Sequence, residues 1–254
     1  MRDESAGNVG FPPTSWVSLF NLAHARGVAA RQAISRLLLR YLPALRAHLI
    51  YHQRLKADAA DDLLQGFVAS KILEQNLLAK ADPHRGRLRN LLLSSLDHYV
   101  SSTRRADKRA KRSPGAGHLN DITDDQIIPS NSSIPSEAFE IAWAKQSITE
   151  ALNRMKEECS ARGRLDLWQL FQGRVVQPAI EGTAPVPYEQ LVQQSGFQTP
   201  AQATNALVTA KRMFVRNLRS VVAEYAQSDA EIDEEVVFLK ASLAKARKSD
   251  PAAE

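Results

Sequence analysis

The sequence predicts an all-α fold. Apolar residues recur at helical spacing over most of the 254 residues, and no stretch alternates apolar and polar residues as a half-buried strand would. The 44% hydrophobic content is ordinary for a globular chain and sufficient for a core. A polar stretch at 113–136, with three prolines and little apolar content, separates two groups of helical patterns. We therefore expect two helical domains, at 11–112 and 137–227, joined by a flexible linker.

The first domain is expected to begin with two amphipathic helices. The first covers about 34–49, and Pro43 is expected to kink it because proline removes a backbone donor. The second runs from about Ala60 to Leu78, with Asp61 and Asp62 near its start, where the helix dipole favours negative charge. Its expected inward residues are Leu64, Phe67, Val68 and Ile72.

The third expected helix of this domain carries the strongest charge signal in the chain. Residues 85–112 contain nine Lys or Arg and two acids. The first half has an apolar stripe that is typical of a helix packed on a core. The stripe consists of Leu88, Leu91, Leu92, Leu96, Tyr99 and Val100. The second half is cationic with almost no compensating carboxylate, which favours binding of a polyanion, so DNA or RNA is the expected partner.

The second domain begins with helical periodicity at Ile141–Cys159 and a shorter apolar cluster at Leu165–Phe171. A loop bearing proline and glycine is expected at Gln177–Pro187. A last helix at 228–248 is expected to be capped by Ser228. Its apolar stripe would pack either on the second domain or on a partner. The stripe consists of Ile232, Val236, Leu239 and Leu243.

Between that loop and the last helix, the sequence has the pattern of a helix-turn-helix. A short helix at Tyr188–Gln194 is followed by a turn at Ser195–Gln198 and a long helix. Thr199 is expected to cap the long helix, with Pro200 at its first position and Gln202 completing a capping box. An ordinary helical hairpin with a glycine turn is the alternative interpretation of this segment.

The long helix is expected to have one buried and one open face. The expected inward stripe is Ala203, Leu207, Ala210, Phe214, Leu218 and Val221. The opposite face carries amides, hydroxyls and guanidinium groups, which are the groups that contact bases and phosphates. These residues are Gln202, Asn205, Thr209, Arg212 and Arg216.

Other classes of protein find little support in the sequence. The single cysteine, Cys159, allows no intrachain disulfide, and Met1–Gly10 lacks a secretory apolar segment, so we expect a cytoplasmic protein. No apolar run is long enough to cross a membrane. His48 and His52 lack the Glu of a zinc-protease motif, and no phosphate loop or nucleophile motif occurs. We therefore expect no metal, no cofactor and no catalytic residue, and hence no enzyme.

Four segments together resemble the extracytoplasmic-function sigma factors of bacterial RNA polymerase, in the long variant that begins Phe-Pro-x-Thr-x-Trp. These segments are Phe11–Trp16, Ala60–Phe67, Asp82–Arg89 and the closing helix Asp229–Leu243. The resemblance covers roughly residues 11 to 245. It implies a protein that binds core RNA polymerase and directs it to promoters. It also implies regulation by an anti-sigma factor or another protein.

The resemblance assigns roles to particular residues. Asp61, Asp62 and Gln65 would dock on the clamp helices of the polymerase β′ subunit. Contacts to the −10 promoter element would come from Arg85, Arg87, Arg89, His98, Arg104, Arg105, Lys108 and Arg109. Contacts to the −35 element would come from Gln202, Asn205, Thr209, Lys211, Arg212 and Arg216.

The chain departs from the family pattern at several positions. Gly66 replaces a usual Glu, Leu88 and Leu91 replace aromatic residues, and His98 stands where Asn is common. Two other functions fit the sequence. One is an independent, dimeric helix-turn-helix regulator with the helix at 232–243 as its dimer face. The other is an RNA-binding adaptor, although aromatic stacking residues are missing around the basic block.

Overall fold

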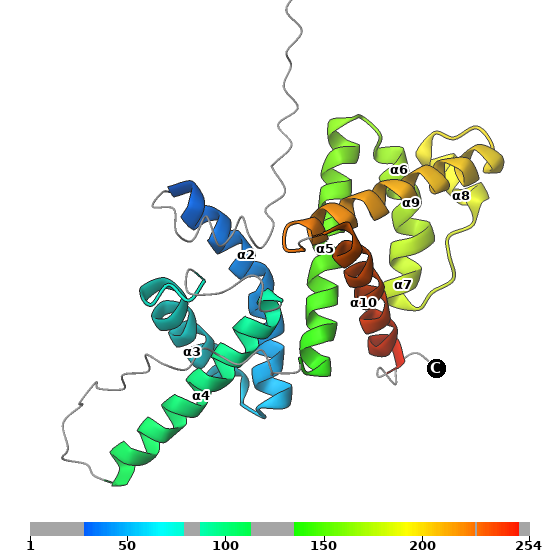
Figure 1. Ribbon diagram of the computed structural model, residues 1–254. Helices are drawn as coiled ribbons and strands as arrows, with labels where there is room; N and C mark the ends of the chain where they lie inside the picture. The colour runs from blue at the N-terminus through cyan, green and yellow to red at the C-terminus, as the bar shows by residue number, and fades with distance from the viewer. Residues whose placement is uncertain (1–27, 79–86, 113–134, 227, 249–254) are drawn as a thin grey trace, which may run out of the picture.

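The computed structural model describes residues 28–78, 87–112, 135–226 and 228–248 (Figure 1). Within these ranges every regular element is a helix and no strand occurs, which confirms the all-α prediction. Residues 113–134 of the expected linker and the motif Phe11–Trp16 lie outside the described residues.

The N-terminal group of helices comprises α2 (Val28–Ala47), α3 (Ala57–Phe67) and α4 (Leu88–Arg112). Short π-helical segments, η1 (His48–His52) and η2 (Val68–Glu74), extend the first two. Pro43 does not divide α2, which continues to Ala47. The helix expected at 60–78 begins earlier and ends at Glu74, within η2.

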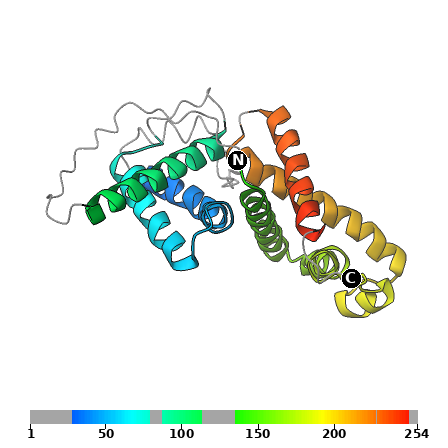
Figure 2. The ribbon, with the colours of Figure 1, turned by 90° about the horizontal axis from the view of Figure 1, so that it is seen from below.

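Helix α5 (Glu137–Ala161) connects this group to the rest of the protein. It contacts α2 on one side and α9 (Pro200–Ala223) and α10 (Asp229–Lys248) on the other (Figures 1 and 2). The Oγ atom of Ser136 accepts a hydrogen bond from the Phe139 N–H and caps α5. Because α5 touches both groups, it fixes their relative placement.

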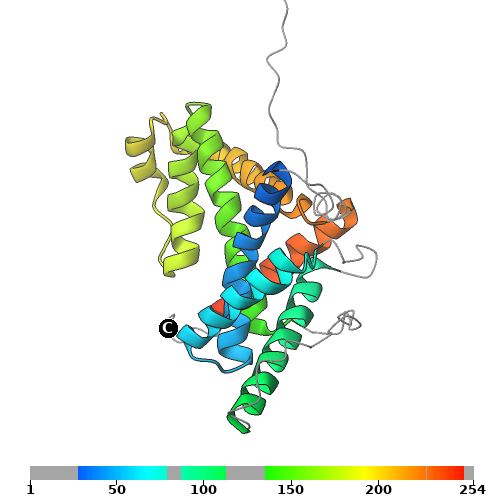
Figure 3. The same cartoon turned by 90° about the vertical axis from the view of Figure 1, so that its left-hand side faces the viewer.

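One hydrophobic core extends across the expected domain boundary. Trp143 of α5 stacks on Tyr41 of α2, with ring centroids 4.2 Å apart, and Tyr225 meets its ring edge at 5.2 Å. The same cluster includes Leu96 of α4 and Leu239 of α10. Figure 3 shows α2 running along α5, in agreement with these contacts. The two expected domains therefore share buried surface in this structure.

A second hydrophobic cluster lies at the other end of α5. It joins α5 to α6 (Leu165–Phe171), α8 (Tyr188–Ser195) and α9. Between α6 and α8 the chain stays helical through η4 (Gln172–Val176) and α7 (Gln177–Glu181), and the helix ends at Gly182 with φ 67°. The loop expected at Gln177–Pro187 thus begins later than predicted. Pro178 lies in the first turn of α7.

The segment 162–187, which had no predicted role, supports α8. The Val186 N–H donates to the Gly173 carbonyl at 3.1 Å, and the Arg174 guanidinium donates to the Val186 carbonyl at 2.8 Å. The same guanidinium lies 4.1 Å from the centroid of the Tyr188 ring. A Cβ atom at Gly173 would lie 3.3 Å from Val186, so glycine allows this close approach. These contacts hold the loop before α8 and the first residue of α8.

Candidate nucleic-acid interface

Helices α8 and α9 are joined by a short turn, and the start of α9 has the predicted Thr199 cap, while Gln202 bonds Gln198 in place of the N-cap residue of a capping box. Helix α8 ends at Gly196 with φ 73°, and the next residue, Phe197, is buried. The Thr199 Oγ1 accepts from the Gln202 N–H at 3.2 Å, and the Gln202 Oε1 accepts from the Gln198 N–H at 2.8 Å. Both cap contacts lie within a few residues of the helix start, and α9 begins at Pro200 as predicted.

The inner face of α9 follows most of the predicted stripe. Ala203, Leu207, Ala210, Leu218 and Val221 are buried as expected. Phe214 is only half-buried and packs on Phe171, with ring centroids 5.2 Å apart, whereas the neighbouring Met213 is buried. The inner face is therefore wider than the stripe that was read from the sequence.

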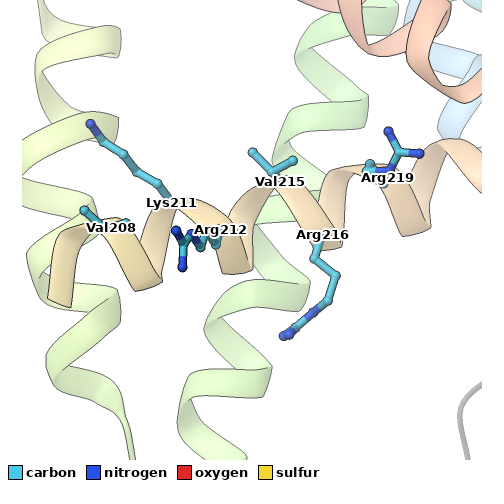
Figure 4. Close-up of a pocket in the computed structure, with 6 residues that line it drawn as sticks. All are labelled: Val208, Lys211, Arg212, Val215, Arg216 and Arg219. Carbon is cyan, nitrogen blue, oxygen red and sulfur yellow. The ribbon is translucent and has the colours of Figure 1, made fainter. Parts of the chain in front are cut away.

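The outer face of α9 carries a shallow apolar groove with a cationic rim (Figure 4). Val208 and Val215 supply its apolar surface. The cations along it are Lys211, Arg212, Arg216 and Arg219. In Figure 4, Lys211 and Arg219 extend to one side of the helix and Arg216 to the other. A polyanion lying along this face would meet positive charge on both sides.

The cations of the α9 groove differ in their partners. Arg216 is paired with Glu158 of α5, and Arg219 is paired with Asp233 of α10. Burial would raise the pKa of Glu158, but hydrogen bonds from Asn217 and Arg216 outweigh it and hold that pKa below its usual range. Lys211 and Arg212 are exposed and form no ion pair within the described ranges. These two cations are the most accessible to a phosphate.

The first half of the outer face is polar and neutral. The Thr209 hydroxyl donates to the Asn205 carbonyl at 3.5 Å, and the Gln202 amide oxygen is held in the cap. The Asn205 side chain is exposed and makes no hydrogen bond to another residue in the described part of the chain. Of the predicted base readers, Asn205 therefore has the most accessible hydrogen-bonding groups.

The basic end of α4 forms a second cationic surface. Arg104, Arg105, Lys108 and Arg109 are all exposed, and this end of the helix projects from the body of the protein (Figures 1 and 3). The Arg104 guanidinium donates weakly to Gln53, at 3.4 Å to both the side-chain and the backbone oxygen. The predicted grouping of these four residues on an open surface is thus present.

The arginines at the start of α4 are placed differently. Arg89 is only 8% exposed, and its Nη1 atom donates to Glu235 of α10 at 2.5 and 2.8 Å. Arg87 is half-buried and binds Glu234 and Glu235. His98 is partly buried and is not free of interactions. Arg85 lies outside the described residues. The sequence predicted that Arg89 binds DNA, but in the structure its guanidinium is paired with Glu235 inside the protein.

Glu235 is a residue that the sequence analysis did not single out. It is 3% exposed and also accepts from Trp143 Nε1 at 3.2 Å and from the Tyr225 hydroxyl at 3.5 Å. Burial, followed by the Glu235 charge, raises the pKa of Tyr225 well above its usual value. The principal partner of Glu235 is Arg89, which is 146 positions away in sequence, so no local pattern indicated the pair.

His48 also has a structural role. Its Nε2 atom lies 2.9 Å from Asp97 Oδ1, and its Nδ1 atom lies 3.0 Å from the Ser136 Oγ. Burial would raise the pKa of Asp97, but hydrogen bonds from His48 and Gln53 hold it below its usual range. In the described part of the chain, no group of three or more His, Cys, Asp or Glu residues is arranged to hold a metal ion.

The residues expected to dock on polymerase lie on an exposed face of α3. Asp61, Asp62 and Gln65 are all exposed. Asp61 forms a two-point contact with Arg46, at 2.6 and 2.9 Å, and the hydrogen bond lowers the pKa of the carboxyl group. A Cβ atom at Gly66 would lie 2.5 Å from the Tyr99 hydroxyl, so a larger residue at this position requires the Tyr99 side chain of α4 to shift.

None of the described helices has the length and apolar character required to cross a membrane. Comparison of the chain with protein-family models, with curated proteins and with solved structures finds no match.

Proposed function

We propose that this protein is a sigma factor of the extracytoplasmic-function type, which binds core RNA polymerase and directs it to promoter DNA. The observation that carries the proposal is the helix-turn-helix of α8 and α9, whose second helix has a long exposed face lined by cations. A face of this kind fits the major groove, where side chains reach base edges while flanking cations contact phosphates.

Each half of the α9 face has a separate task in this proposal. Asn205 is in the half with neutral polar groups, and its amide matches the donor and acceptor pattern of adenine. Lys211 and Arg212 follow two turns later and would contact phosphates, which adds affinity but no sequence preference. The proposed −35 contacts thus combine one amide that recognises a base with two cations that bind phosphates.

The basic end of α4 and the acidic face of α3 complete the proposed assembly. Arg104, Arg105 and Arg109 would hold the DNA backbone near the −10 element. Asp62 and Gln65 are exposed without a partner within the described ranges and would contact the β′ clamp helices. Linking two weak DNA readers through the polymerase gives selectivity when both elements are correctly spaced.

The direct test is capture of purified core RNA polymerase by the full chain, followed by transcription from a library of random promoter sequences. We expect capture, and we expect transcripts whose start sites share two upstream elements. D62A/Q65A should lose capture but keep DNA binding, whereas N205A should keep capture and lose selective transcription. Failure of the wild-type protein to bind core polymerase would reject this function.

A stand-alone helix-turn-helix regulator is the second candidate. The core shared by α2, α4, α5 and α10 favours it, because this packing holds the two cationic surfaces in one fixed arrangement. Such a protein would bind its operator without polymerase. A palindromic footprint, together with no capture of core polymerase, would identify this function instead.

A further inference from the structure

Val208 lies in the middle of the outer face of α9. Residues three or four positions apart fall on the same side of a helix. A stripe with this spacing runs along α9, opposite the buried Ala203, Leu207 and Ala210. The stripe consists of Ala201, Asn205, Val208 and Arg212, which are all exposed. These side chains point away from the body of the protein, so they would reach deepest into a groove of DNA.

Val208 is an apolar residue among cations. Its exposed fraction is 46%, and it lines the α9 groove together with Val215, which is 43% exposed (Figure 4). A single exposed valine is ordinary on a protein surface. The cations of the same groove are Lys211, Arg212, Arg216 and Arg219. The surface therefore fits a partner that combines negative charges with apolar groups.

Duplex DNA is a partner of this chemistry. Its phosphates border a major groove in which each thymine exposes an apolar 5-methyl group. The side chain of valine has no hydrogen-bond donor or acceptor, so Val208 cannot recognise the polar edge of a base. An apolar contact with a methyl group removes both groups from water, which is favourable. Thymine is the only one of the four bases with this methyl group, so such a contact distinguishes thymine from the other three.

The spacing of Val208 and Asn205 matches a step between base pairs. Three residues of an α-helix advance by about 4.5 Å, and neighbouring base pairs are about 3.4 Å apart. Asn205 has an exposed amide, which can bind both hydrogen-bonding groups of an adenine. With Asn205 on an adenine, Val208 therefore faces the next base pair.

We propose that Val208 is a specificity-determining residue, which contacts the 5-methyl group of a thymine in the base pair next to the adenine bound by Asn205. The inference rests on the proposed contact of α9 with promoter DNA. The thymine lies in either strand, because both strands present their bases in the major groove. Asn205 and Val208 together select two neighbouring A·T pairs, while the cations of the α9 groove bind phosphates.

The test replaces thymine by deoxyuridine, which lacks only the 5-methyl group. Duplexes are first selected from a random library with the wild-type full chain, and each thymine of the shared sequence is then replaced in turn. Fluorescence anisotropy gives the affinity of each labelled duplex. One replacement, next to the adenine that N205A no longer distinguishes, should weaken wild-type binding about threefold to fivefold, as expected for the loss of one buried methyl group. V208A should bind both forms of this duplex with equal affinity.

The matched control is V215A, which makes the same change on the same face two turns later. V215A should lose as much affinity on the deoxyuridine duplex as the wild-type protein does. Val208 is exposed and alanine favours helices, so V208A should be at least as stable as wild type in urea denaturation.

Two results would overturn the role of Val208. They are a wild-type protein that binds every deoxyuridine duplex unchanged, and a V208A protein that keeps the wild-type loss. K211Q/R212Q distinguishes this failure from failure of the proposed function. If K211Q/R212Q binds the selected duplex as tightly as wild type, or if selection yields no shared sequence, the proposed DNA surface itself fails. If K211Q/R212Q binds more weakly while the wild-type protein is insensitive to the methyl groups, only the role of Val208 fails.

Discussion

The start of α4 and the outer face of α9 carry arginines that the sequence assigns to the same task, yet the two regions have different environments. Lys211 and Arg212 on α9 are exposed, whereas Arg89 on α4 is buried against Glu235. The difference arises because α10 packs its acidic turn against the start of α4 and reaches only the end of the α9 face. A basic segment therefore indicates a polyanion partner only where no acidic element of the same chain covers it.

The largest expected effect comes from removing the buried carboxylate. E235A leaves Arg89 buried without its counter-charge, so the free energy of unfolding should fall by about 3–5 kcal/mol. Urea denaturation followed by circular dichroism measures this change. The neighbouring E234A, which alters only an exposed pair, should change stability by about 1 kcal/mol or less. Equal effects of the two variants would show that the buried contact between Arg89 and Glu235 stabilises the protein no more than the exposed pair of Glu234 does.

The next largest effect concerns the other end of α4. R104Q/R105Q/R109Q removes three exposed cations, so duplex affinity should weaken and its salt dependence should flatten by up to about 3. Anisotropy titrations at several salt concentrations give the slope. Because these side chains lie outside the core, the urea midpoint should stay at the wild-type value. An unchanged salt dependence would remove phosphate contact from the role of this surface.

A smaller effect on the free energy of unfolding is expected from the local cap at the start of α9, a feature that distinguishes it from the start of α4. Helix α9 starts with a local cap, so T199A should reduce the free energy of unfolding by about 1 kcal/mol. T209A, further along the same helix and exposed, should change it by about 0.5 kcal/mol or less. Thermal or urea unfolding of the two variants decides this point. If T199A is as stable as T209A, the start of α9 depends on distant contacts, as the start of α4 does, and not on its local cap.

The smallest effect is a pH dependence within the α4 packing. The folded-state pKa of Asp97 is lowered, so its contribution to stability is present above its usual pKa of 3.8 and is lost as pH falls through the folded value. The stability difference between wild type and D97N should therefore hold between about pH 5 and 7 and shrink below about pH 4. A difference that grows on acidification would contradict the hydrogen bonds assigned to Asp97 from His48 and Gln53.

The parts of the fold that the sequence predicts correctly are those set by neighbouring residues. The cap at Thr199, the start of α9 at Pro200 and the cap at Ser228, where the hydroxyl accepts from the Glu231 N–H at 3.3 Å, all depend on residues within one turn. Helical periodicity likewise predicted the stripe of α10, in which Val236 and Leu239 are buried.

Features that depend on distant residues were not predicted. Trp143 of α5 stacks on Tyr41 of α2 across the expected domain boundary, and periodicity does not encode that contact. Arg89 has the same local pattern as the exposed arginines. Only its hydrogen bond to Glu235 in the folded protein distinguishes it from them. The exposure of the outer face of α9 was predicted correctly, because it follows from the helix face alone.

The most direct test of the central claim, that the outer face of α9 contacts nucleic acid, is the salt dependence of duplex binding by K211Q/R212Q. Both residues are exposed, so the variant should keep the wild-type free energy of unfolding. Its affinity should fall, and the slope of log affinity against log salt should decrease by about 2. A slope equal to that of wild type in a folded variant would contradict the claim.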